Sequence, residues 1–207
     1  MWYFALQVVS RIMFPVLFRL RVFGRSNVPV SGPVLLASNH QSFLDPPLIG
    51  IAVDRPVHYM ARKSLFAVSV LFTRLIRSLN AFPVERGGGD VSGVRAAMRR
   101  LRAGAAVLVF PEATRTTTGE IGELKDGLFR VAARTGAAVV PTVIDGAFEA
   151  WPRWKRVGSP GVVWVAFGEP LRPEEFGGNA GAMAGEALRR LREMQKGLRE
   201  KRRNVAR

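Results

Sequence analysis

Short apolar runs that alternate with segments of helical length constrain the fold of this chain more than any other feature. The runs predict buried strands at residues 34–37, 57–60, 82–84, 105–110, 137–144 and 162–167. The intervening segments predict helices at residues 46–53, 64–79, 90–102 and 126–134, and the chain is helical in composition from about residue 173. Strands alternating with helices predict a single α/β domain with a largely parallel central sheet flanked by helices, and 207 residues suffice for its core.

Capping residues set the expected ends of these helices. Ser64 is a suitable N-cap for the helix that runs to about Leu79, and Asp90 for the helix that Gly104 follows. The apolar residues of 64–79 cover more than one helix face. This predicts either deep burial of that helix or its contact with lipid.

Residues 1–24 form the second expected unit, a helical segment ahead of the α/β domain at 25–207. The segment is rich in aromatic and apolar residues, but Arg11, Pro15 and Arg19 interrupt it, which disfavours a spanning helix. It also lacks the basic leader and cleavage site of a signal peptide. We expect it to lie in the headgroup interface of a membrane, the alternative being an ordinary helix packed on the core.

The formal net charge of +15, carried mostly by arginine, limits the partners that this chain can have. Such a surface attracts nucleic acid, anionic lipid or phosphorylated small molecules, and charge alone does not choose among them. The chain has no cysteine, which excludes disulfides and cysteine nucleophiles, and its two histidines make a metal centre unexpected.

The segment Asn39-His40-Gln41-Ser42-Phe43-Leu44-Asp45 follows the first core strand and precedes Pro46. Along a regular helix, the five steps from His40 to Asp45 rotate the side-chain direction by about 500°, so the two side chains would not share a face. They meet only if the residues between them form a loop or tight turn. In that case Asp45 accepts the proton of one imidazole nitrogen and leaves the other nitrogen basic. The alternative is that Asp45 is merely the N-cap of the next helix.

Two further strand ends carry compatible side chains. Phe110-Pro111-Glu112-Ala113-Thr114-Arg115-Thr116 brings a glutamate, an arginine and hydroxyl groups together, a set suited to holding a phosphate and orienting a hydroxyl. Its alternative is a polar turn with a local Glu–Arg pair. Phe82-Pro83-Val84-Glu85-Arg86 places another arginine, Arg86, at a strand end.

These segments, in this order, resemble the conserved blocks of the glycerolipid acyltransferase family. Asn39, His40 and Asp45 match its first block, residues 82–86 its second, residues 110–116 its third, and the proline-containing run at 139–144 its fourth. The third block departs from the usual Phe-Pro-Glu-Gly-Thr-Arg-Ser at two positions, Ala113 and Thr116. An alanine in place of glycine requires a negative φ if the backbone is to remain unstrained.

The resemblance implies transfer of a fatty acyl chain from acyl-CoA or acyl-carrier protein to the sn-2 hydroxyl of lysophosphatidic acid, forming phosphatidic acid. It implies that His40 is the general base and Asp45 its partner, with no cofactor or metal. Substrate binding falls to Arg86, Glu112, Thr114, Arg115 and Lys125, of which Lys125 either stabilises the oxyanion or is a solvated lysine. The implied place of action is the cytoplasmic face of the cell membrane, bound peripherally or monotopically.

Other acceptors remain open, namely another lysolipid or glycerol 3-phosphate. From another class, a non-catalytic basic protein that binds anionic membranes is possible. A nucleic-acid-binding module is disfavoured, because the sequence has no recognition helix, zinc site or aromatic RNA-binding signature.

Overall fold

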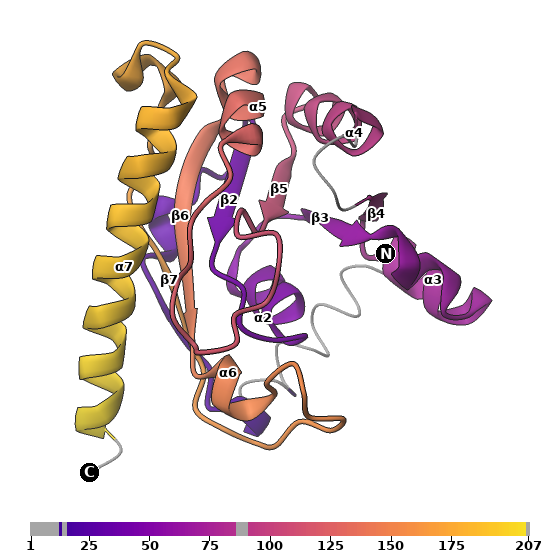
Figure 1. The fold of residues 1–207 in the computed structure, drawn as a ribbon, viewed down its shortest axis with the longest axis vertical. Helices are drawn as coiled ribbons and strands as arrows, with labels where there is room; N and C mark the ends of the chain where they lie inside the picture. The colour runs from indigo at the N-terminus through magenta and orange to yellow at the C-terminus, as the bar shows by residue number, and fades with distance from the viewer. Residues whose placement is uncertain (1–12, 14–15, 86–90, 206–207) are drawn as a thin grey trace.

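The computed structural model describes residue 13 and residues 16–85 and 91–205 of the 207-residue chain. Seven strands form one sheet in the order β1-β7-β6-β2-β5-β3-β4 (Figure 1). They are β1 (Arg21–Phe23), β2 (Val34–Ser38), β3 (Val57–Arg62), β4 (Ala81–Val84), β5 (Ala106–Val109), β6 (Ala138–Asp145) and β7 (Trp164–Phe167). Each of the six predicted strands is present, and the expected α/β fold is confirmed.

The sheet is parallel except where β7 meets β6. Strands β6, β2, β5, β3 and β4 run parallel to one another, β7 is antiparallel to β6, and β1 is parallel to β7. Consequently the carboxyl ends of β2, β3, β4, β5 and β6 share one edge of the sheet. Loops that follow these strands are therefore brought to the same end of the molecule.

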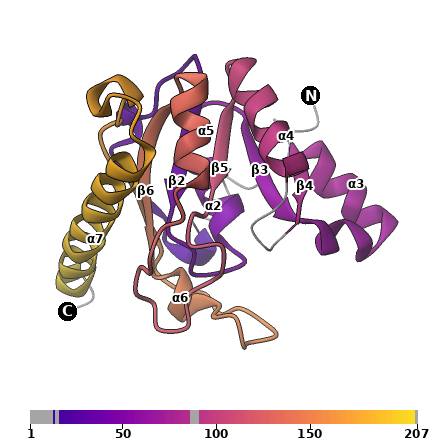
Figure 2. The same cartoon turned by 45° about the horizontal axis from the view of Figure 1, so that its top comes forward.

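Helices cover both faces of the sheet, as Figures 1 and 2 show. The α-helices are α2 (Asp45–Ala52), α3 (Val70–Ser78), α4 (Val91–Arg102), α5 (Gly127–Thr135), α6 (Ala147–Ala150) and α7 (Ala180–Val205). Three 3-10 helices accompany them, η1 (Arg25–Asn27), η2 (Lys63–Ala67) and η3 (Pro173–Phe176).

Alternating side chains of the central strands divide the core between the two faces. In β2, Val34 and Leu36 pack in the cluster that contains α2, whereas Leu35 and Ala37 pack in the cluster that contains α4 and α5. β5 divides its residues in the same way, with Val107 and Val109 on the α4 side. Every residue of β2, β5 and β6 is buried, as expected for parallel strands covered on both faces.

The expected continuous helix at residues 64–79 is wrong. The chain forms η2, turns at Ser69, and begins α3 at Val70. Ser69 is extended (φ −161°) and its hydroxyl accepts the N–H of Phe72 at 3.1 Å, so Ser69 and not Ser64 caps the helix. Deep burial is also wrong, because α3 has no buried residue.

The expected helical segment at residues 1–24 is wrong at its C-terminal end. Residues 21–23, assigned from sequence to the helical segment, form β1 and pair with β7. Residues 1–12 and 14–15 lie outside the described part of the chain, as do the expected cap Asp90 and the site residue Arg86. Association of the first 24 residues with a membrane stays a prediction. Within the described residues, no helix combines the length and apolarity needed to cross a bilayer.

Candidate active site

The loop from Asn39 to Leu44 turns His40 back toward Asp45. Asn39 extends the pairing of β2 with β6 through its side chain, since its amide donates to the Ile144 carbonyl (2.9 Å) and accepts the Ile144 N–H (2.8 Å). The backbone is thereby released from the sheet one residue before His40. No local pattern in the sequence reveals this role of Asn39, because its partner lies 105 residues away.

His40 and Asp45 form the predicted pair. His40 Nδ1 lies 2.7 Å from Asp45 Oδ2, and the same oxygen accepts the backbone N–H groups of Gln41 (2.6 Å) and Ser42 (2.7 Å). Because an ionised carboxylate can only accept hydrogen bonds, Nδ1 carries the proton and Nε2 is left as the basic nitrogen. The His40 side chain is 15% exposed, whereas that of Asp45 is fully buried.

The N-cap interpretation of Asp45 is wrong. Leu44 is the N-cap of α2, and Asp45 is the first residue within the helix. Its carboxylate points back into the preceding loop, where three donors hold it, and Pro46 and Pro47 offer no N–H to cap. Asp45 therefore organises the His40 loop as well as the His40 ring.

The imidazole is held from a second direction by the third block. The ring of His40 stacks on Phe110, with ring centroids 3.9 Å apart and planes 16° from parallel. The His40 carbonyl accepts the Thr116 N–H at 2.8 Å. These contacts join the loop after β2 to the loop after β5, as the parallel sheet predicts.

Glu112 links backbone segments on either side of this loop. Its Oε1 accepts the His40 N–H and its Oε2 accepts the Gly122 N–H, both at 2.9 Å. Burial raises the pKa of Glu112, and these two N–H groups oppose that shift. The hydrogen bonds of Glu112 therefore brace the backbone and not Arg115. Contact of Glu112 with a substrate stays a prediction.

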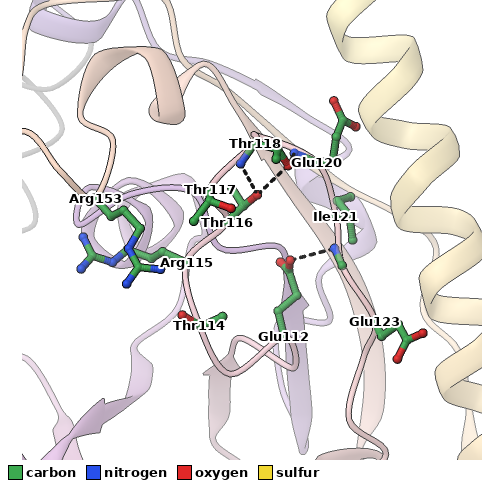
Figure 3. Close-up of a pocket in the computed structure, with 11 residues that line it drawn as sticks. Glu112, Thr114, Arg115, Thr116, Thr117, Thr118, Glu120, Ile121, Glu123 and Arg153 are labelled. Atoms are coloured by element: carbon green, nitrogen blue, oxygen red, sulfur yellow. Dashed lines mark hydrogen bonds between the residues drawn. The ribbon is translucent and has the colours of Figure 1, made fainter.

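A pocket of 390 Å³ lies beside this arrangement (Figure 3). Nine of its eleven lining residues have polar or charged side chains, and the lining consists of Glu112, Thr114, Arg115, Thr116, Thr117, Thr118, Glu120, Ile121, Gly122, Glu123 and Arg153. Figure 3 shows the guanidinium groups of Arg115 and Arg153 at one end of it and the three glutamates toward the other. Two guanidinium groups at one end suit a phosphate, which they bind with paired N–H groups.

Arg115 is oriented by an aromatic ring. Its guanidinium carbon lies 3.6 Å from the centroid of Phe43, and Phe43 in turn contacts Trp151 with centroids 5.8 Å apart. Such a contact restricts a long flexible side chain before any ligand binds. Phe43 belongs to the loop between His40 and Asp45, so one loop positions both His40 and Arg115.

The other predicted site residues have different outcomes. Thr114 lines the pocket, as expected for a substrate contact. Lys125 is exposed and does not belong to the pocket lining, although its N–H bonds to the Pro111 carbonyl at 3.0 Å. Arg153 also lines the pocket and was not predicted, because it lies in the loop before β7 with no motif around it.

The C-terminal helix also contributes to this region. The Gly119 carbonyl accepts side-chain N–H groups from Gln41 (3.3 Å), Gln195 (3.0 Å) and Arg199 (2.8 Å). Arg199 is itself paired with the buried Asp145 at 3.2 Å. Helix α7 thus ties the pocket loop at residues 116–122 to the His40 loop, a role that its basic composition alone does not reveal.

Ala113 adopts a backbone conformation that sequence analysis did not expect. Its φ is +61°, in the left-handed region, where the sequence-based expectation required a negative φ. The turn is closed by the Ala113 N–H, which bonds to the Phe110 carbonyl at 2.9 Å. The turn of the third block therefore keeps its geometry although its usual glycine is absent, and the strain is borne locally.

Replacing Ala113 with glycine is expected to stabilise the protein. Relief of the left-handed strain exceeds the extra entropy of an unfolded glycine, so the free energy of unfolding should rise by about 0.5–1 kcal/mol. Calorimetry should show a Tm higher by about 1–3 °C. Ala96→Gly within α4 is the matched control and should lower Tm, and a decrease for both variants would contradict the assignment.

Comparison with known proteins agrees with this geometry. The Acyltransferase family model matches residues 19–145, and the chain belongs to that family. A chloroplastic 1-acyl-sn-glycerol-3-phosphate acyltransferase of Arabidopsis thaliana is 31% identical over 70% of this chain, a match that spans 40% of that relative's own length. The corresponding Bacillus subtilis enzyme is 28% identical over 76% of each chain.

A solved structure shares the fold. The crystal structure of the 1-acyl-sn-glycerophosphate (LPA) acyltransferase PlsC from Thermotoga maritima superimposes with a TM-score of 0.84 at 25% identity. The match covers 95% of this chain and 79% of the other. The α/β fold deduced from the strand and helix pattern is therefore that of a known acyltransferase.

Proposed function

We propose that this chain transfers a fatty acyl group from a thioester donor to the sn-2 hydroxyl of lysophosphatidic acid, forming phosphatidic acid. One observation carries the proposal: the 2.7 Å His40–Asp45 pair stands beside a pocket that two arginines line. The names of the relatives support the same acceptor. Acyl-CoA and acyl-carrier protein are the two candidate donors, each a co-substrate, and the proposal requires no resident cofactor or metal.

The proposed reaction has two steps. In the first, His40 Nε2 removes the proton of the acceptor hydroxyl as its oxygen bonds to the thioester carbonyl carbon, and Asp45 stabilises the imidazolium. In the second, the tetrahedral intermediate expels the thiolate, and His40 gives the thiolate the proton that it took from the hydroxyl. An ester and a free thiol result, and no acyl group is attached to the protein.

The acceptor is proposed to bind through its phosphate. Arg115 is held against Phe43 and, with Arg153, provides two forks of N–H donors. Arg86, outside the described residues, is proposed as a third phosphate contact. Thr114 is proposed to contact the substrate, and Lys125 to stabilise the oxyanion.

The place of action is proposed to be an anionic membrane surface at the cytoplasmic face of the cell membrane. The net charge of +15 supports an anionic surface, because basic side chains are attracted to acidic headgroups. The lipid acceptor itself resides in such a surface. Nucleic acid is not proposed as a partner.

Product analysis with several acceptors tests the proposal. The purified chain receives a mixture of acyl-CoA chain lengths, or acyl-carrier protein, with lysophosphatidic acid, glycerol 3-phosphate, lysophosphatidylcholine or monoacylglycerol, and mass spectrometry quantifies the esters formed. We expect phosphatidic acid to form at least tenfold faster than diacylglycerol. Equal rates with monoacylglycerol, which has no phosphate, would refute the assigned acceptor.

A further inference from the structure

Helix α3 and the turn before it expose a row of apolar side chains. Val68, Val70, Leu71, Phe72 and Leu75 are all exposed, with Leu71 at 79% and Val70 at 70%. Leu71 and Leu75 are one helical turn apart and share a side of the helix. These five residues are called the α3 face. An exposed apolar patch of this kind marks an interaction surface.

The rest of the described chain leaves the α3 face uncovered. Helix α3 contacts η2 and β4, and none of its residues enters a core cluster. Its local structure is nonetheless well specified, by the Ser69 cap and by a bond from the Thr73 hydroxyl to the Phe66 carbonyl at 2.8 Å. The helix is therefore formed and placed without burial of its apolar side chains.

The charged residues within 62–84, the stretch that contains the α3 face, are all basic. Residues 62–84 include Arg62, Lys63, Arg74 and Arg77 and contain no aspartate or glutamate. All four basic side chains are exposed, although Lys63 pairs with Glu85 at 2.5 Å. Apolar side chains bordered by arginines match a layer of acyl chains beneath anionic phosphates.

The position of α3 is compatible with delivery of a lipid to the pocket. The η2–α3 segment follows the carboxyl end of β3. Strands β3, β5 and β2 are parallel, so their carboxyl ends lie at the same end of the sheet. The segment therefore leaves the sheet at the edge where His40 and Arg115 lie. Both ribbon views show α3 projecting at the end of the molecule opposite α7 (Figures 1 and 2).

We propose that the α3 face docks the protein on an anionic phospholipid bilayer. The apolar side chains enter the boundary between headgroups and acyl chains, and Arg74 and Arg77 contact lipid phosphates. The inference rests on the proposed function in one respect, that the substrates are membrane lipids. It assigns docking to an element distinct from residues 1–24.

Vesicle partition tests the docking surface. The vesicles contain phosphatidylcholine and about 30% phosphatidylglycerol, which supplies the anionic headgroups. The variant is Val70→Glu/Leu71→Glu, whose glutamates lie in the first turn of α3, where the helix dipole favours negative charge. We expect at least a tenfold weaker partition. Val30→Glu is the matched control, because Val30 is 86% exposed and lies in the loop before β2, at the end of the sheet opposite to that of His40. The partition of this control variant should change less than twofold.

A second variant tests the electrostatic half of the proposal. Arg74→Gln/Arg77→Gln should weaken partition onto the anionic vesicles about tenfold and should make partition less dependent on salt. On vesicles of phosphatidylcholine alone, it should behave like the unaltered protein. Equal partition of all variants would overturn the proposal and assign binding to another segment.

Two other occupants of the α3 face give distinct results that also overturn the proposal. If residues 1–12 cover it, the glutamate variant will lose several degrees of Tm with unchanged partition. If a second copy covers it, light scattering will show a dimer that the glutamate variant converts to a monomer, again with unchanged partition.

Activity in detergent micelles separates this inference from the proposed function. Micelles present the acceptor without a bilayer, so the glutamate variant should retain kcat within twofold there while losing turnover on vesicles. A protein inactive in micelles before any substitution refutes the proposed function instead, and vesicle partition still decides the docking surface.

Discussion

Replacing Asp45 with asparagine is expected to lower kcat for acyl transfer by about 10³-fold. Asp45 Oδ2 accepts all three hydrogen bonds at this site, from His40 Nδ1, Gln41 and Ser42. The asparagine oxygen can take the same position and retain them, so the loop and the imidazole tautomer are preserved. What is lost is the negative charge that stabilises the imidazolium formed as the acceptor is deprotonated.

The measurement is kcat from thiol release at saturating donor and acceptor. Asp54→Asn is the matched control, because Asp54 is exposed and pairs with Arg25 at 3.3 Å. The kcat of this control variant should stay within twofold of that of the unaltered protein. Circular dichroism should show that both variants are folded. A decrease of less than tenfold for Asp45→Asn, in a folded protein, would mean that the charge of Asp45 does not assist the base.

Replacing Arg115 with leucine is expected to raise KM for lysophosphatidic acid by about 10–100-fold, since a hydrogen bond to a charged group contributes about 1.5–3 kcal/mol. Arg115 lines the pocket and its guanidinium carbon lies 3.6 Å from the centroid of the Phe43 ring, so the variant loses the preorganised group that we propose binds the phosphate. Lysine should not restore binding, because it has no planar fork to stack on Phe43.

The choice of acceptor makes this prediction specific. Any slow turnover of monoacylglycerol, which has no phosphate, should be nearly insensitive to Arg115→Leu. Arg95→Leu on α4 is the matched control, exposed and outside the pocket lining, and should leave both KM values unchanged. Equal losses for the two acceptors would show that Arg115 supports the loop and does not bind phosphate.

Local sequence signals predicted the fold well where neighbouring residues determine the structure. The apolar runs of β2, β5 and β6 are buried on both faces, and Gly136 ends α5 in the left-handed conformation (φ +65°). The helix break at Ser69 was missed because Ser64 and Ser69 are both acceptable caps. The extended backbone of Ser69 decides between them.

The sequence predicted the motif residues of the site but not the hydrogen bonds that hold those residues in place. Spacing alone left the N-cap interpretation of Asp45 open, and the resemblance to the acyltransferase family favoured the His40–Asp45 pair. The structure brings the two side chains together. The supports depend on distant segments: Asn39 on Ile144, and Gly119 on Gln195 and Arg199. Arg153 reaches the pocket from the loop before β7. No local pattern encodes such contacts, because the fold alone creates them.

The central claim, that His40 Nε2 is the base that activates a lipid hydroxyl, is tested most directly by thiol release with His40→Ala. Purified protein in detergent, supplied with lysophosphatidic acid and acyl-CoA, should release free thiol in step with phosphatidic acid formation. We expect His40→Ala to lower this rate by at least about 10³-fold while the protein remains folded. Near-normal turnover by the variant would contradict the account.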